Sequence, residues 1–304
     1  MTYFIDLRAD SAGGNPVGSA ADVVIRTDAQ PDPNPNRSLG PGLIQAVQGR
    51  DVLLVTHGFH VNRASGIGYL SHWNEWVQLG PNGFFVGVLW PGDSRWLPFV
   101  DYPIEGDEAI KSGQLLAEYL LGNFKGVNSL SFASHSLGAR TMLEAIRGLG
   151  KTFTLETLTV MAGAIDDTSL VNEYKDAAAL MKNVSVLASS CDEVLKWAFP
   201  AGNTFAGIVT RGDPYWHGAL GRDGPNPADQ PANLWQTPNL PVLWNFGHGS
   251  YINSDGPIVG PPNESGPFAM PVVVPPQGTA TPPYQKNWQQ ALAAGFVSTR
   301  FAGK

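Results

Sequence analysis

The five residues Ser-His-Ser-Leu-Gly at positions 134–138 place a serine between small residues, where one sequence pattern gives way to another. The apolar run at 129–133 is typical of a strand, and residues 139–149 repeat apolar side chains at helical spacing. A serine on a sharp strand-to-helix turn is presented for nucleophilic attack, and the next backbone N–H faces the oxyanion formed in acyl transfer. Ser136 is therefore the candidate nucleophile.

The usual form of this turn is Gly-x-Ser-x-Gly, and here Ser134 stands in place of the first glycine. Small residues on both sides let the backbone fold back without a side-chain clash. Because serine is itself small, we expect the turn to form with Ser134 at that position.

Acyl transfer also requires N–H donors for the oxyanion. The apolar run at 51–56 leads into His-Gly-Phe at 57–59. Where a nucleophile is held on this kind of turn, one donor comes from such a loop and the other from the residue after the serine. The pattern assigns the oxyanion hole to the backbone N–H groups of Phe59 and Leu137. We expect the His57 ring to shape the loop by hydrogen bonding rather than to act as a base.

A base must remove the serine proton, and a carboxylate must orient that base. The turn resembles the nucleophile turn of α/β-hydrolases, in which the order along the chain is serine, acid, histidine. Two histidines lie far enough along the chain, and we favour His248, because the glycines on both sides of it suit an exposed loop with special dihedral angles. His217 is the alternative base. Two aspartates close apolar runs after the serine: Asp166 follows 155–162, and Asp192 follows 184–188.

The composition of the chain argues against several classes of function. The chain has 304 residues, 43% of them hydrophobic, and a net charge of −7, which argues against nucleic-acid and anionic-membrane partners. Its lone Cys191 cannot form an internal disulfide, and the sequence shows no signal peptide and no apolar stretch of transmembrane length. These features predict a cytoplasmic protein, with export left open. No metal-ligand pattern and no glycine-rich phosphate or dinucleotide loop appears, so we expect neither a metal nor a cofactor.

Strand-like and helix-like segments alternate along most of the chain. An early antiparallel pair is expected at 3–8 and 21–27, with a proline-marked loop after it. Further strands are expected at 51–56, 84–90, 129–133, 155–162 and 184–188, with helices at 66–79, 107–121, 137–149 and 169–181. This alternation predicts the α/β class with a mostly parallel, doubly wound sheet.

The last third of the chain differs in amino-acid composition. Residues 200–285 are rich in proline, glycine and tryptophan, with a strand expected at 241–246 and a final helix at 285–294. We interpret this region as ordered loops that wrap the domain or form a lid. The sequence thus predicts one domain over 1–304, with a core at about 50–252 and a C-terminal extension at 253–304.

Five short motifs, taken together, resemble the α/β-hydrolase superfamily and are similar to a bacterial branch of mostly uncharacterised proteins. They are Val-Thr-His-Gly-Phe at 55–59, Leu-Trp-Pro-Gly at 89–92, Ser-His-Ser-Leu-Gly at 134–138, Ala-Ser-Ser-Cys-Asp at 188–192 and Gly-His-Gly at 247–249. The resemblance covers about residues 50 to 252. It implies an esterase- or lipase-type site, and it favours Asp192 over Asp166, since most members take the acid from the later strand.

The expected function is that of a serine hydrolase that cleaves carboxylic esters through Ser136, His248 and Asp192, with an acyl-enzyme intermediate and no cofactor. Aromatic residues at 94–103, Trp197 and Phe199 suggest a neutral, fairly apolar small-molecule ester. Two alternatives use the same scaffold: an amide- or peptide-cleaving hydrolase or acyltransferase with the same triad, and a binding module without catalysis. The sequence does not indicate the oligomeric state.

Overall fold

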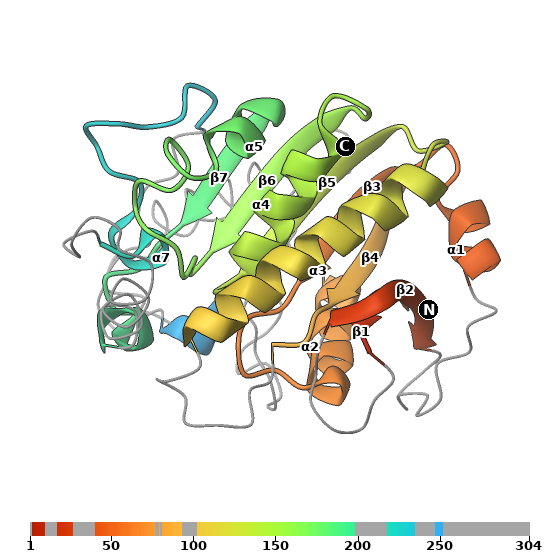
Figure 1. Cartoon of the computed structure of the whole chain (residues 1–304), viewed down its shortest axis with the longest axis horizontal. Helices are drawn as coiled ribbons and strands as arrows, with labels where there is room; N and C mark the ends of the chain where they lie inside the picture. The colour runs from red at the N-terminus through yellow and green to blue at the C-terminus, as the bar shows by residue number, and fades with distance from the viewer. Residues whose placement is uncertain are drawn as a thin grey trace, which may run out of the picture.

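A seven-stranded sheet forms the centre of the protein (Figure 1). The computed structural model describes residues 2–9, 17–26, 40–76, 79, 81–92, 102–197, 218–234 and 247–251. The strands are β1 (Thr2–Arg8), β2 (Val17–Arg26), β3 (Asp51–Thr56), β4 (Gly83–Leu89), β5 (Ser129–His135), β6 (Leu155–Met161) and β7 (Asn183–Leu187). They lie in the order β2-β1-β4-β3-β5-β6-β7.

The sheet is mostly parallel, which confirms the predicted α/β class. β1 and β2 pair antiparallel at one edge, as the sequence predicted, and every other pairing is parallel. Every residue of β3, β5 and β6 is buried, as expected for strands covered on both faces. The largely apolar character of these segments was therefore a sound basis for the prediction.

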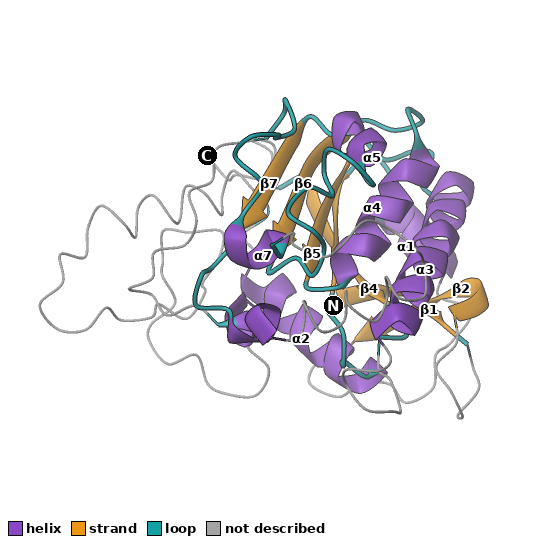
Figure 2. Ribbon diagram, turned by 60° about the vertical axis from the view of Figure 1, so that its left-hand side comes forward, coloured by secondary structure: helices purple, strands orange, loops and turns teal. Residues whose placement is uncertain are grey.

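Helices cover both faces of the sheet. They are α1 (Gly40–Ala46), α2 (Arg63–Trp76), α3 (Tyr102–Asn123), α4 (Gly138–Leu149), α5 (Lys175–Leu180) and α7 (Leu220–Asp223), with a 3₁₀ turn, η3, at His248–Tyr251. Figures 1 and 2 show α3, α4 and α5 against one face and α2 against the other. This division follows from right-handed crossovers, because the chain moves across the sheet in one direction from β3 to β4 and in the other from β4 to β7.

The change of direction creates a topological switch point at the carboxyl ends of β3 and β5. From β3 the chain continues to β4 on one side, while β5 lies on the other side of β3. In open α/β sheets, ligands bind outside the carboxyl ends of the strands at such a switch point. The loop at 57–59 and the turn at 136–138 both begin there. The topology thus brings the predicted oxyanion loop to the predicted nucleophile.

Three local predictions differ from the structure. The helix expected at 169–181 is shorter, because the chain forms successive turns up to Tyr174 and only Lys175–Leu180 is α-helical. Tyr174 N–H donates to the Ser169 carbonyl at 2.7 Å and so closes a wide turn, and the helix begins only after it. α1 begins at Gly40, where the prolines had suggested a loop, and α7 was not predicted.

Several other predictions fall on residues that the structure does not describe. These are the strand at 241–246, the helix at 285–294, the aromatic residues at 94–101, the C-terminal extension at 253–304 and most of the wrap or lid expected at 200–285, of which only 218–234 and 247–251 are described. Within the described part of the chain, no helix combines the length and the hydropathy needed to span a membrane.

Candidate active site

Ser136 occupies a strained turn between β5 and α4. Its φ angle is 54°, a left-handed conformation that costs a non-glycine residue about 1–3 kcal/mol. Two backbone hydrogen bonds to the end of β6 hold it there: Ser136 N–H donates to the Met161 carbonyl at 3.0 Å, and the Ser136 carbonyl accepts from Ala164 N–H at 3.2 Å. The turn forms with the buried Ser134 in place of glycine, as expected. It has the geometry of a nucleophile elbow.

Two glycines allow the loop at 57–59 to pack directly against this turn. A Cβ atom added to Gly58 would lie 2.7 Å from the Ser136 Cβ, and one added to Gly138 would lie 2.3 Å from the His57 carbonyl oxygen. Real Cβ atoms do not approach other atoms so closely, and the atom facing Gly138 belongs to rigid backbone. Glycine is therefore required at both positions for the close approach of the two loops.

His248 links Ser136 to Asp192. Its Nε2 lies 2.9 Å from the Ser136 Oγ, and its Nδ1 lies 2.8 Å from the Asp192 Oδ2. The Asp192 side chain is fully buried, and that of His248 is 16% exposed. In a neutral imidazole the nitrogen next to the carboxylate carries the proton, which leaves Nε2 to accept the Ser136 hydroxyl proton. The arrangement can therefore move a proton from serine to histidine.

Asp192 is held at the N-terminus of the helical segment at 193–197, where Lys196 N–H donates to its backbone carbonyl at 3.2 Å. Its Oδ1 accepts a hydrogen bond from Leu195 N–H at 2.9 Å, so each carboxylate oxygen has its own partner. The alternative acid, Asp166, follows β6 and forms a β-bridge with Ala219 instead. The alternative base, His217, lies outside the described residues. Of the four candidates, the structure thus brings His248 and Asp192 together.

The backbone N–H groups of Phe59 and Leu137 belong to the two loops that meet beside Ser136. Among the described residues neither group has a hydrogen-bond acceptor. Leu137 also directly precedes α4, so the helix dipole adds positive potential at this point. Unpaired donors at a helix N-terminus are suited to stabilise a developing negative charge.

His57 holds the loop at 57–59 to the end of β4, in agreement with the role predicted for it. Its Nδ1 donates to the Gly58 carbonyl at 2.9 Å, and its Nε2 accepts from Trp90 N–H at 3.4 Å. The Trp90 ring stacks on the imidazole, and its Nε1–H donates to the His57 carbonyl at 2.9 Å. Trp90 is completely buried, so it belongs to the core and braces this loop.

His135, the residue before the nucleophile, is buried, and its Nε2 lies 2.7 Å from the His248 carbonyl oxygen. The sequence held a weak signal of this contact, because a polar ring at the end of a buried strand needs a hydrogen-bond partner. Its partner lies 113 residues further along the chain and could not be identified from the pattern.

Burial keeps both His57 and His135 neutral. Loss of solvent lowers the pKa of each imidazole to about 3, and electrostatic repulsion of the protonated ring adds to this effect, from Arg8 for His57 and from the neighbouring His248 for His135. Neutral rings beside the site do not oppose the positive charge that forms on His248 during proton transfer.

These two histidines should make the fold sensitive to acid. In the unfolded chain they take up protons below their ordinary pKa of 6.5, whereas the folded protein resists protonation down to about 3. The unfolded state binds more protons in that window, so the free energy of unfolding falls as the pH falls, by about 1.4 kcal/mol per pH unit for each ring. Urea unfolding at a series of pH values measures this slope.

The matched control is His135→Gln, which removes one of the two imidazoles. Its slope between about pH 4 and pH 6 should be smaller than that of the wild type by about 1.4 kcal/mol per pH unit. Equal slopes for the two proteins would show that His135 is protonated in the folded state as easily as in the unfolded one.

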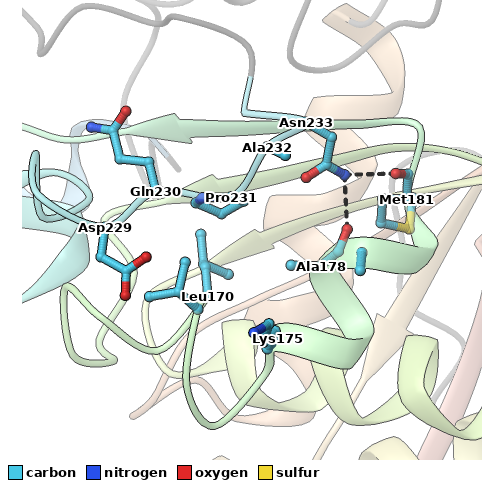
Figure 3. Close-up of a pocket in the computed structure, with 11 residues that line it drawn as sticks. Leu170, Lys175, Ala178, Met181, Asp229, Gln230, Pro231, Ala232 and Asn233 are labelled. Carbon is cyan, nitrogen blue, oxygen red and sulfur yellow. Dashed lines mark hydrogen bonds between the residues drawn. The ribbon is translucent and has the colours of Figure 1, made fainter.

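A separate pocket lies beside α5 and the start of β7 (Figure 3). Its volume is about 460 Å³, and its walls are mostly apolar, with Lys175 and Asp229 as the charged residues. Asn233 closes one side by donating to the carbonyl oxygens of Ala178 and Met181. The pocket contains none of the three linked residues of the Ser136 site. In the described part of the chain, no group of three or more His, Cys, Asp or Glu residues could hold a metal ion.

Comparisons with known proteins give few matches. No family model and no curated protein matches the chain. Among solved structures, the crystal structure of esterase PE8 is 17% identical at a TM-score of 0.31, covering 48% of this chain and 72% of that one. A C6-C4 SN3 inhibited esterase B from Lactobacillus rhamnosis is 12% identical at a TM-score of 0.29, covering 54% of this chain and 63% of that one. Likeness at this level assigns neither a family nor an activity to the chain.

Proposed function

We propose that the protein is a serine hydrolase of the α/β-hydrolase superfamily that cleaves carboxylic esters. One observation carries the proposal: the Ser136 hydroxyl, the His248 imidazole and the Asp192 carboxylate form a continuous hydrogen-bonded series at 2.9 and 2.8 Å. The strained turn under Ser136 supports the same chemistry, as do the two N–H groups beside it, which have no acceptor among the described residues. The strand order supports the location, because the series lies at the switch point of the sheet.

In the proposed reaction, His248 Nε2 takes the hydroxyl proton as the Ser136 Oγ attacks the ester carbonyl. The N–H groups of Phe59 and Leu137 stabilise the oxyanion of the tetrahedral intermediate. His248 then gives its proton to the leaving alcohol, and a water molecule, activated in the same way, releases the acid and restores Ser136. Throughout the cycle Asp192 holds the imidazole in the required tautomer and stabilises its charge.

The substrate class is proposed to be a neutral, fairly apolar small-molecule ester. The support is the aromatic sequence at 94–103 together with Trp197, a residue that is 68% exposed in the helical segment after Asp192. An exposed tryptophan offers apolar contact area for an acyl chain. The same triad is compatible with amide cleavage and with acyl transfer, so the leaving group must be determined by experiment.

Active-site labelling and a substrate panel test the proposal. A fluorophosphonate probe should attach to Ser136, located by peptide mass spectrometry, and p-nitrophenyl esters of increasing chain length should be hydrolysed. Labelling with faster cleavage of matched amides would instead indicate an amidase or peptidase, and ester formation with an added alcohol an acyltransferase. A folded protein that neither reacts with the probe nor turns over any ester would be a binding module.

A further inference from the structure

His135 contacts each of the parts that the proposed reaction needs. It immediately precedes the nucleophile and ends β5. Its ring lies against the loop at 57–59, since a Cβ atom added to Gly58 would lie 2.8 Å from the His135 Nδ1. Its Nε2 faces the His248 carbonyl oxygen at 2.7 Å, and the centroids of the two imidazole rings are 4.9 Å apart. One buried side chain therefore joins the nucleophile turn, the oxyanion loop and the segment that carries the base.

The protonation state of His135 follows from its partner. A carbonyl oxygen only accepts hydrogen bonds, so the His135 Nε2 must carry a proton and donate it. Burial lowers the pKa of this ring to about 3, so the donor is a neutral imidazole at physiological pH. A cation at this position would repel the imidazolium that forms on His248. The neutral Nε2–H tautomer supplies the donor without that repulsion.

The bond from His135 differs in kind from the two ring contacts of His248. The contact between His248 Nε2 and Ser136 Oγ is lost once Ser136 is acylated, and Nε2 must then serve the leaving group and the water. The His248 carbonyl takes no part in proton transfer, so its bond to His135 can persist through every step. Such a bond fixes the backbone from which the imidazole projects.

We infer that His135 is a positioning residue for the catalytic base: its Nε2–H···O bond to the His248 carbonyl holds the His248 imidazole in line between Ser136 and Asp192. The inference rests on the proposed function, because it assigns His248 as the base. It accounts for a polar ring buried at a strand end, where an apolar residue would pack without needing a partner. His135 contributes through the backbone of His248 and does not itself exchange protons with the substrate.

Two substitutions separate positioning from packing. His135→Leu keeps an apolar body of similar size and removes the donor. His135→Gln places an N–H group the same number of bonds from Cα as Nε2, so it can still reach the His248 carbonyl. A small displacement of a catalytic group costs up to about 10²-fold in rate. We expect His135→Leu to lower kcat by about 10- to 100-fold with little change in KM, and His135→Gln to retain most of the activity.

The rate of reaction with the fluorophosphonate probe should follow kcat, since His248 activates Ser136 in both reactions. Urea unfolding shows whether each variant is folded. If His135→Leu does not fold, His135→Asn takes its place, because its shorter amide cannot reach the same carbonyl; the expected order is then Gln active and Asn impaired. Equal kcat for the donor-bearing and donor-lacking variants, or for His135→Leu and the wild type, would overturn the positioning role.

A spectroscopic measurement separates this inference from the proposed function. The ¹⁵N NMR signals of His135 should show a neutral Nε2–H tautomer at about pH 5, and those of His248 should shift in His135→Leu. If the wild type neither hydrolyses esters nor reacts with the probe, the proposed function fails and the assignment of His248 as a base fails with it. If the wild type is active and His135→Leu leaves both kcat and the His248 signals unchanged, only the positioning role fails.

Discussion

Ser136→Ala is expected to lower kcat for ester hydrolysis by roughly 10⁴- to 10⁶-fold. The substitution removes the only atom of the residue that can form the acyl-enzyme, while the backbone donors of Phe59 and Leu137 stay in place. Some rate above that in water should therefore remain, because an oxyanion hole and substrate binding still accelerate direct attack by water. Steady-state hydrolysis of a p-nitrophenyl ester, with mass spectrometry of the probe-treated variant, measures both consequences.

Ser134→Ala is the matched control for this variant. Ser134 is buried on β5, two residues before Ser136, and its hydroxyl donates a long hydrogen bond, 3.5 Å from its Oγ to the Thr159 carbonyl. Alanine is also small enough for the turn, so kcat should stay close to that of the wild type. A Ser136→Ala protein that is folded and retains most of the wild-type kcat would disprove Ser136 as nucleophile.

The turn that carries Ser136 shows why this part of the site could be recognised in the sequence. Ser136 has a left-handed backbone, and Gly138 lies where any side chain would collide with the His57 carbonyl. Both requirements involve residues close together in the chain, so they produce a recognisable sequence pattern of small residues at fixed spacing. The buried strands could be recognised for a similar reason, since strands covered on both faces are rich in apolar residues instead of alternating apolar with polar ones.

Contacts between distant segments left no comparable pattern. The bond from His135 to the His248 carbonyl joins residues 113 positions apart, and nothing near either residue specifies the other. The β-bridge between Asp166 and Ala219 likewise depends on how the segment at 218–221 packs against the end of β6. For this reason the sequence left two aspartates open, and the side-chain geometry around His248 distinguishes them.

The short α5 shows a limit of helical periodicity. Residues 169–174 carry apolar side chains at helical spacing, yet Tyr174 N–H bonds back to the Ser169 carbonyl, and the chain makes turns instead of a regular helix. Buried side chains from this segment still reach the core, because Leu170 and Tyr174 are almost fully covered. The apolar spacing therefore correctly indicated which side chains are buried, but it wrongly predicted that the backbone is helical.

Asp192→Asn should lower kcat by about 10⁴-fold while leaving the fold intact. The carboxylate has two separate tasks, since Oδ1 accepts from Leu195 N–H and Oδ2 faces the His248 Nδ1. Asparagine keeps one oxygen for the Leu195 N–H and presents its amide NH₂ to the imidazole. That donor requires Nδ1 to be unprotonated and moves the proton to Nε2, where it blocks acceptance of the Ser136 proton.

Asp166→Asn is the matched control for this experiment, because it makes the same chemical change at the alternative acid. Because the His248 Nδ1 faces the Asp192 Oδ2, this variant should keep kcat close to that of the wild type. Kinetics for the two variants, with urea unfolding to verify that each is folded, decide between the acids. The reverse result, a large loss in Asp166→Asn and none in Asp192→Asn, would assign the orienting carboxylate to Asp166 and require His248 to turn away from Asp192 during catalysis.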